Sequence, residues 1–180
     1  MCPRKDALEV LVSDHRAVDK IFERLESGNG RRDQLLSTLV RELSIHDAVE
    51  KQVLYPVVRR QLPRGARTAD KALSEHQKVE EQLAEIDGAD LEAPSVQRRL
   101  ASMVTKVRRH VKEEEEAIFP ALRGAVTKKF LLEMRDQLDK AKRMAPTHPH
   151  PHAPDSALGT TMAGLAAAPV DRARDALRSR

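Results

Sequence analysis

The sequence predicts an all-α protein: an up-and-down antiparallel four-helix bundle with an appended C-terminal helix and an extended tail. Apolar residues recur at helical spacing in five successive stretches, separated by short turns that contain glycine or proline. Charged residues make up 33% of the chain and aromatic residues only 2%, which is typical of amphipathic helices and unlike an aromatic-rich β-sandwich. Because short turns make neighbouring long helices antiparallel, the first four stretches predict a bundle.

The first two helices are predicted at residues 6–26 and 32–61, bounded by Gly28 and Pro63. Both apolar stripes also contain polar residues of metal-binding type, on the face that must point into the bundle. The stripes are Leu8, Leu11, Val12, His15, Val18 and Phe22, and then Leu35, Leu39, Leu43, His46, Glu50, Val53 and Val57.

Three further helices are predicted at residues 68–86, 95–122 and 127–144, with Gly88 and Gly124 as stop signals. The first two of these stripes again carry histidine and glutamate, whereas the last is purely apolar. The stripes are Ala69, Ala72, Leu73, His76, Val79, Glu80 and Leu83, then Val96, Leu100, Met103, Val107, His110, Glu114, Ala117 and Ala121, then Phe130, Leu131, Met134 and Leu138.

We therefore expect one domain over residues 1–144 and a tail over residues 145–180. Prolines alternate with three histidines at the start of the tail, which predicts an extended segment, and residues 170–178 have the pattern of a short helix. The tail histidines are either surface ligands for nickel, copper or zinc or part of a flexible polar segment, and we do not place them at a central site. They are His148, His150 and His152.

Composition excludes several classes of protein. The 32 basic and 28 acidic residues are interspersed, so the net charge of +4 argues weakly for a nucleic-acid or membrane partner, and we expect neither. The single cysteine, Cys2, excludes an internal disulfide and a multi-thiolate zinc site. No apolar run approaches the about 20 residues that a membrane span needs, and no apolar signal core follows Met1, so we expect a cytoplasmic protein.

The chain contains an internal repeat, with units at about residues 5–62 and 67–124. Each unit has one histidine in its first helix and, in its second, a histidine, a glutamate four residues later, and an aromatic residue followed by proline. The two sets are His15, His46, Glu50, Tyr55 and Pro56, and His76, His110, Glu114, Phe119 and Pro120. Two such helix pairs would bury their apolar faces by packing together.

The repeat predicts a metal centre. Residues four apart lie about 40° apart around a helix, so His46 and Glu50 share the inward face, as do His110 and Glu114. Burying two carboxylates and four imidazoles without partners costs several kcal/mol. A pair of cations compensates for this cost, and nitrogen and carboxylate donors in a helix bundle suit iron, manganese or zinc.

The same residue types also occur in proteins that bind no metal. A single buried histidine is ordinarily bonded to a carbonyl, and in a metal-free interaction module apolar residues would replace all four histidines with little loss of stability. Within the run of glutamates from 113 to 116, periodicity selects only Glu114 for the interior. Glu80 and, less favoured, Asp19 each follow a histidine by four residues, so each is either a ligand or a partner of a ligating imidazole.

Tyr55 is a candidate catalytic or ligating residue. Ideal geometry turns it about 100–140° away from the face that carries His46 and Glu50, but Pro56 is expected to kink the helix there and bring the phenol toward the site. The repeat places Phe119 at the same offset, which favours packing for this position.

Over roughly residues 5–125 the chain resembles the hemerythrin-like family with the HHE cation-binding domain. The matching elements are the segment around His15, the His-x3-Glu blocks with their aromatic-proline ends, and Glu75-His76. The resemblance implies a four-helix bundle and two non-haem iron ions, with an oxo or hydroxo bridge, that bind dioxygen, peroxide or nitric oxide. The ligands that it implies are His15, His46, Glu50, His76, His110 and Glu114.

This sequence differs from oxygen-carrying members of that family, which have a second histidine where Glu80 stands. We therefore expect decomposition or binding of a small oxidant, including catalase-like peroxide dismutation, in defence against oxidative or nitrosative stress. The alternative is a sensor of oxygen, iron or redox state, or a reversible oxygen-binding protein. The expected partners are the small ligand and a protein contacted through the tail, in a monomer or weak dimer.

Overall fold

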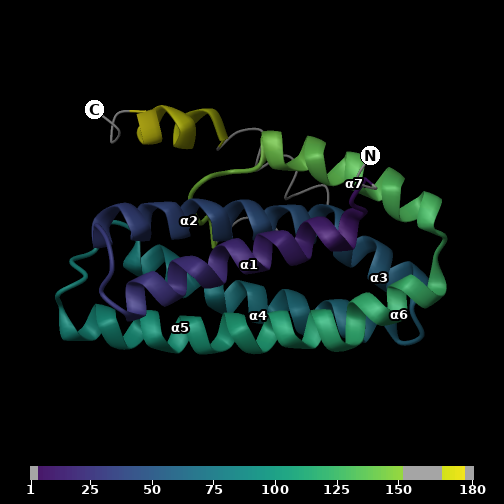
Figure 1. Ribbon diagram of the computed structural model, residues 1–180, viewed down its shortest axis with the longest axis horizontal. Coiled ribbons are helices and arrows are strands. Elements are labelled where there is room, and N and C mark those ends of the chain that lie inside the picture. Colours follow the sequence, from purple (N-terminus) through teal and green to yellow (C-terminus); the bar gives the residue numbers. More distant parts are fainter. Residues whose placement is uncertain (1–3, 152–167, 177–180) are drawn as a thin grey trace.

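The computed structural model describes residues 4–151 and 168–176, and over these residues the regular structure is helical, with no strand. Figure 1 shows long antiparallel rods, with α7 lying across the bundle on the side of α1 and α2. The predicted all-α class, with a bundle and an added C-terminal helix, is confirmed. The elements are α1 (Ala7–Glu26), α2 (Arg32–Val49), η1 (Glu50–Leu54), α3 (Tyr55–Gln61), α4 (Gly65–Ile86), α5 (Pro94–Glu113), η2 (Glu114–Ile118), α6 (Phe119–Ala125) and α7 (Lys128–Met144).

Two of the four rods contain a π-helical turn. These turns, η1 and η2, begin at Glu50 and Glu114, and each ends just before an aromatic-proline pair. Proline has no N–H and its ring crowds the carbonyl four residues back, so a wider turn relieves the conflict. Within them the N–H of Tyr55 donates to the Glu50 carbonyl and that of Phe119 to the Glu114 carbonyl, five residues back in each case.

The extra residue in each π turn changes which side chains face inward. The predicted stripe placed Ala117 and Ala121 in the core, and this is wrong, because both are exposed. Ile118 and Leu122, one position later, are buried instead. A strict 3.6-residue period cannot anticipate such a one-residue shift.

Local interactions fix the helix ends. Asp6 and Glu9 form a reciprocal capping box at the start of α1, and Asp6 also pairs with Arg123 of α6 at 2.7 Å. Gly65 begins α4 so close to α3 that a Cβ atom there would lie 2.1 Å from the carbonyl oxygen of Val58. Only glycine therefore fits where the two helices meet.

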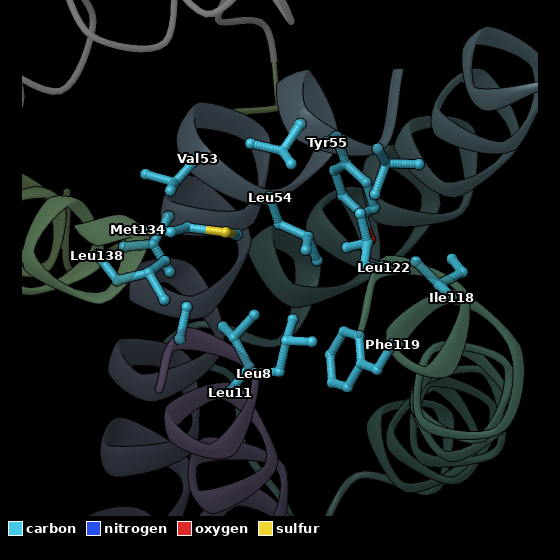
Figure 2. Close-up of a cluster of buried hydrophobic side chains, with 14 of the residues drawn as sticks. Leu8, Leu11, Val53, Leu54, Tyr55, Ile118, Phe119, Leu122, Met134 and Leu138 are labelled. Atoms are coloured by element: carbon cyan, nitrogen blue, oxygen red, sulfur yellow. The ribbon is translucent and has the colours of Figure 1, made fainter. Parts of the chain in front are cut away.

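Two apolar clusters fill the bundle, and the predicted metal-binding side chains lie between them. One cluster, at the end where the chain enters α1, includes Leu11, Val49 and Leu122. The other includes Val18, Leu43 and Val107. Figure 2 shows the first cluster, in which Tyr55 and Phe119 lie beside aliphatic side chains. The four stripe histidines thus form a polar layer inside an otherwise apolar core.

Helix α7 belongs to the same core. Its Met134 and Leu138 are 1% and 0% exposed, and in Figure 2 they point toward Val53 and Leu54 of η1. Lys142 on the same helix pairs with Asp14 of α1 at 2.5 Å. The appended helix therefore covers α1 and η1 next to the polar layer.

The tail begins without regular structure at residues 146–151, and residues 168–176 are helical, near the short helix expected at residues 170–178. His148 and His150 lie against the bundle, whereas His152 and residues 177–178 lie outside the described residues. Within the described ranges, no helix combines the length and apolarity that a membrane crossing requires.

Candidate metal centre

The polar layer brings together four histidines and two glutamates, one histidine from each rod of the bundle. Two groups of donor atoms, each within 4.8 Å of one another, are formed: His15, His46, Glu50 and Glu114, and Glu50, His76, His110 and Glu114. All six residues are buried, and both glutamates are fully inaccessible. The two carboxylates are common to both groups, so the arrangement has the form of two neighbouring sites with shared acids.

The ring nitrogens of the histidines surround the two carboxylates. In the first group, Nε2 of His15 lies 3.3 Å from Glu114 Oε2, and Nε2 of His46 lies 3.2 Å from Glu50 Oε2. In the second group, Nε2 of His76 lies 3.4 Å from Glu50 Oε2, and Nε2 of His110 lies 3.5 Å from Glu114 Oε1. Within 3.5 Å, each carboxylate therefore contacts one histidine of its own repeat unit and one of the other.

Every one of these histidines points Nε2 inward. The outer nitrogen, Nδ1, meets a carboxylate in three cases: Glu115 at 2.8 Å from His15, Asp47 at 2.7 Å from His76, and Glu75 at 3.1 Å from His110. Such partners fix the ring and tautomer of a metal-binding histidine. The Nδ1 atom of His46 is buried and has no such partner among the described residues.

Tyr55 also lies in the cluster. Its Oη donates to Glu114 Oε1 at 2.8 Å and lies 2.8 Å from His76 Nε2 and 3.1 Å from His110 Nε2. In a regular α-helix Tyr55 would lie about 140° from Glu50, but a turn bonded over five residues places it nearly above that residue. The expected kink at Pro56 is thus a π turn, and it brings the phenol to the second group.

Phe119, the repeat equivalent of Tyr55, lies next to the first group. Its ring stacks on that of His15, with centroids 5.9 Å apart and planes 11° apart. The two groups consequently differ: the second has a phenol oxygen where the first has an apolar ring.

Two protonated imidazoles balance the charge of the two glutamates in the metal-free chain. Burial opposes the charge on His15, but the nearby carboxylates of Glu114 and Glu50 outweigh it and raise the pKa of His15 to about 10. Burial likewise opposes charge on His110, yet the contacts with Glu114 raise its pKa to about 9. Burial favours neutral carboxyls, but the imidazolium neighbours hold the pKa of Glu114 well below its usual value and also lower that of Glu50.

The donor set fits a pair of metal ions. Both oxygens of Glu50 and Oε2 of Glu114 are buried without a hydrogen-bond partner among the described residues. Buried acceptors of this kind are rare unless a ligand satisfies them. Imidazole nitrogen and carboxylate oxygen are donors that iron, manganese and zinc accept.

Glu80 and Asp19, which the sequence offered as further ligands, do not join the cluster. Glu80 lies on the side of α4 that meets Lys51, and its Oε2 accepts a hydrogen bond from Lys51 Nζ at 2.8 Å. Asp19 is 42% exposed and pairs with Arg108 at 2.8 Å. In both cases a basic side chain, Lys51 or Arg108, holds the carboxylate away from the centre of the bundle.

Sequence reasoning missed the carboxylates that contact the outer nitrogens. Glu75 and Asp47 each adjoin a site histidine in the sequence, and Glu115 adjoins Glu114. Their position next to a candidate ligand in the sequence could have indicated that they lie near the site. It could not have identified their partners, because each of the three contacts a histidine on another helix. Only the packing of the helices determines those pairings.

Two cavities reach the cluster from different sides. One, of about 270 Å³, lies between α1 and α5 and is lined by His15, Arg16, His46 and Arg108 among others. The other, of about 240 Å³, is lined by His46, His76 and His110 together with residues of α2, α4 and α5. Each has room for a small molecule beside the histidine rings.

The family described as "Hemerythrin HHE cation binding domain" matches residues 6–122 of this chain. An uncharacterized hemerythrin-like protein of Schizosaccharomyces pombe is 29% identical over 170 residues, covering 93% of this chain and 84% of that protein. The "DNA nickase" of a Nostoc species is 26% identical over 118 residues, covering 64% of this chain and 33% of the nickase.

A similar fold occurs in the crystal structure of a hemerythrin HHE cation-binding domain-containing protein from Mycobacterium kansasii. The TM-score is 0.66 at 24% identity, and the match covers 78% of this chain and 86% of that one. This similarity supports the fold. The matched family region ends at residue 122, before α7 and the tail.

Proposed function

The chain belongs to the hemerythrin HHE cation-binding family, and from that premise we propose that it is a non-haem di-iron protein that decomposes hydrogen peroxide. Nitric oxide and dioxygen are further ligands of the same site. The proposed role is defence against oxidative or nitrosative stress.

The observation that carries this proposal is the sharing of Glu50 and Glu114 by both groups of donor atoms. A carboxylate with two oxygens facing two neighbouring groups is suited to bridge two cations. A single ion would leave one group of imidazoles and carboxylate oxygens unsatisfied in a buried layer, at a cost of several kcal/mol.

His15, His46, His76 and His110 would hold the ions through Nε2, two histidines to each ion. Glu115, Asp47 and Glu75 keep three of the rings oriented by accepting from Nδ1. Among the described residues no fifth histidine joins the site: the position four residues after His76 is Glu80, and its carboxylate binds Lys51. Oxygen-rich coordination favours the ferric state and so disfavours reversible carriage of dioxygen.

We propose Tyr55 as the additional oxygen donor of the second group. Its Oη lies within hydrogen-bonding distance of three inward-pointing atoms, on His76, His110 and Glu114. Burial, followed by the charge of Glu114, raises the pKa of Tyr55 well above its usual value, so the phenol is protonated in the metal-free chain. It must therefore release a proton when it binds a cation.

Iron, when bound, supplies the redox change that peroxide chemistry needs. In the overall reaction one peroxide loses two electrons and two protons to give dioxygen, and a second takes them up to give two waters. The chain contributes geometry and access: the glutamates would hold the pair together, and the cavities next to His46 would give a small oxidant a route to the site.

The test is oxygen evolution by iron-loaded protein. We expect one dioxygen for every two peroxides consumed, and we expect the zinc-loaded protein to be inactive because zinc has no redox chemistry. An inactive protein with full iron occupancy would contradict the peroxide proposal. Titration with nitric oxide would then test the alternative of reversible binding or sensing.

A further inference from the structure

A chain of buried polar contacts leads outward from His76. Asp47 Oδ1 lies 2.7 Å from His76 Nδ1, and Asp47 Oδ2 lies 3.0 Å from Lys51 Nζ. Lys51 is only 6% exposed and also donates to Glu80 Oε2 at 2.8 Å. A buried ammonium is tolerated only with such carboxylate partners, so the positions of these residues depend on one another.

The chain of contacts continues into the tail. The second oxygen of Glu80, Oε1, accepts a hydrogen bond from the backbone N–H of His150 at 2.9 Å. Next to it, Gln77 of α4 donates to the carbonyl of Pro151 at 2.7 Å. His150 and Pro151 belong to residues 147–151, which we call the docked segment.

The docked segment is held on its other side by the C-terminal helix, residues 168–176. Asp171 accepts from the backbone N–H groups of Thr147 and His148, at 3.1 and 3.3 Å. The ring of His148 is buried, with Nδ1 2.8 Å from Asp87 and Nε2 3.0 Å from Asp175. The segment is therefore bound to α4 and to the C-terminal helix by defined polar contacts.

The internal repeat provides a comparison. The repeat equivalent of Asp47 is Val111, and the repeat equivalent of Glu80 is Asp19, which pairs with Arg108 instead. The outer nitrogen of His15 meets Glu115, whose second oxygen binds the exposed Arg16. Among the residues that the structure describes, the connection through Asp47, Lys51 and Glu80 therefore runs between α2–η1 and α4, on the side of the tail, and has no counterpart between α5–η2 and α1.

We infer that Lys51 and Glu80 are positioning residues that couple the docked segment to the metal ligand His76. The inference rests on the proposed metal site. An ion on Nε2 of His76 fixes the ring and keeps the proton of Nδ1 directed at Asp47. Asp47 then holds Lys51, Lys51 holds Glu80, and Glu80 holds the backbone of the docked segment.

Coupling of this kind is reciprocal. Metal loading strengthens docking of the segment, and docking slows release of the metal. Metal occupancy thereby controls a change at the surface of the protein. With metal bound, the segment and the C-terminal helix are docked on the bundle; without it, they are more often undocked and can bind another molecule.

Hydrogen exchange of the full chain, measured by mass spectrometry, tests this coupling. The probes are the amides of Thr147, His148 and His150, with and without ferrous iron added under argon. We expect iron to slow exchange of these amides by about tenfold, within the usual range of allosteric coupling. In Glu80→Ala the same amides should exchange equally fast with and without iron.

A matched control is Glu85→Ala. Glu85 is another carboxylate on α4, but it pairs with Arg99 of α5 and has no contact with the described part of the tail. This variant should retain the iron-dependent protection. A second variant, His148→Ala, changes only the tail and should speed transfer of iron to a chelator several-fold while the bundle stays folded.

The outcomes separate the two proposals. If elemental analysis finds iron bound but the tail amides exchange within about twofold of the metal-free rate, the coupling is wrong and the metal site stands. Unchanged iron release in His148→Ala would contradict the coupling in the same way. If the folded chain binds no iron, both proposals are overturned.

Discussion

The hydroxyl of Tyr55 donates a hydrogen bond of 2.8 Å to Oε1 of Glu114, a residue of the other repeat unit. The π turn that begins at Glu50 makes this contact, because it carries the phenol around the helix to the face of the two carboxylates. The equivalent turn at Glu114 places Phe119 against His15. A near-symmetric backbone thus produces two chemically different halves.

Tyr55→Phe tests the role of the phenol. In the metal-free chain it should cost about 1–3 kcal/mol of unfolding free energy, because buried polar atoms on Glu114 and the histidines lose a partner. In the ferric protein it should abolish a visible phenolate-to-iron absorption band. Phe119→Leu, at the equivalent position, should keep that band. A band that persists in Tyr55→Phe would contradict ligation by Tyr55.

Glu50→Gln tests the sharing of the carboxylates. Because Glu50 belongs to both groups of donor atoms, we expect this single change to lower iron content for both ions together. The control is Glu116→Gln, in which the altered side chain is exposed on the same run of glutamates as Glu114. Retention of one full ion in Glu50→Gln, measured by elemental analysis, would show that the two positions are independent.

The stability of the metal-free chain should depend on pH in a defined direction. The pKa values of His15 and His110 are raised to about 10 and about 9, against 6.5 in the unfolded chain. The two histidines therefore make their full contribution to the free energy of unfolding below about pH 6.5. It is lost as the pH rises through 9 and 10. Because the pKa values of Glu50 and Glu114 are lowered, these carboxylates contribute to the free energy of unfolding above about pH 4.5. That contribution is lost as the pH falls further.

Urea unfolding of the metal-free chain should therefore give the highest free energy between about pH 5 and 6.5 and a decline toward pH 10. Iron-loaded protein should lack this alkaline decline, because bound imidazoles are already neutral, and loading near neutral pH should release about two protons from these histidines. A metal-free stability that is flat from pH 6.5 to 10 would contradict the assigned charges.

Much of the fold follows from periodicity and turn residues. Stripes around His15, His46, His76 and His110 predict four rods with one histidine each, and the structure places all four rings in one layer. The glutamates are equally accessible to sequence reasoning, because four-residue spacing fixes their face. This part of the site depends only on local geometry, so it can be read from the chain.

The remaining features of the fold and the site depend on how the helices pack against one another, which local sequence patterns do not specify. The π turns shift Ile118 and Leu122 into the core, and the shift follows from how the helix accommodates Pro120 within the packed bundle. The pairing of Glu115 with His15 depends on how α1 and η2 approach each other. Docking of His148 likewise depends on residues brought together only by the complete fold.

Helix α7 is expected to stabilise the bundle although it lies beyond the region that matches the family. Met134→Ala should cost about 2–5 kcal/mol of unfolding free energy, because the side chain is 1% exposed and packs against α1 and η1. Lys140→Ala, on the exposed side of the same helix, should change stability by less than about 0.5 kcal/mol. Equal effects in urea unfolding would show that α7 is only loosely attached.

The most direct test of the central claim is X-ray absorption spectroscopy of iron-loaded full chain, combined with iron analysis. We expect two irons per chain, coordinated by nitrogen and oxygen, with a metal–metal scattering contribution that disappears in Glu50→Gln. A folded chain that holds one isolated iron, or none after anaerobic loading, would contradict the shared carboxylate site of Glu50 and Glu114.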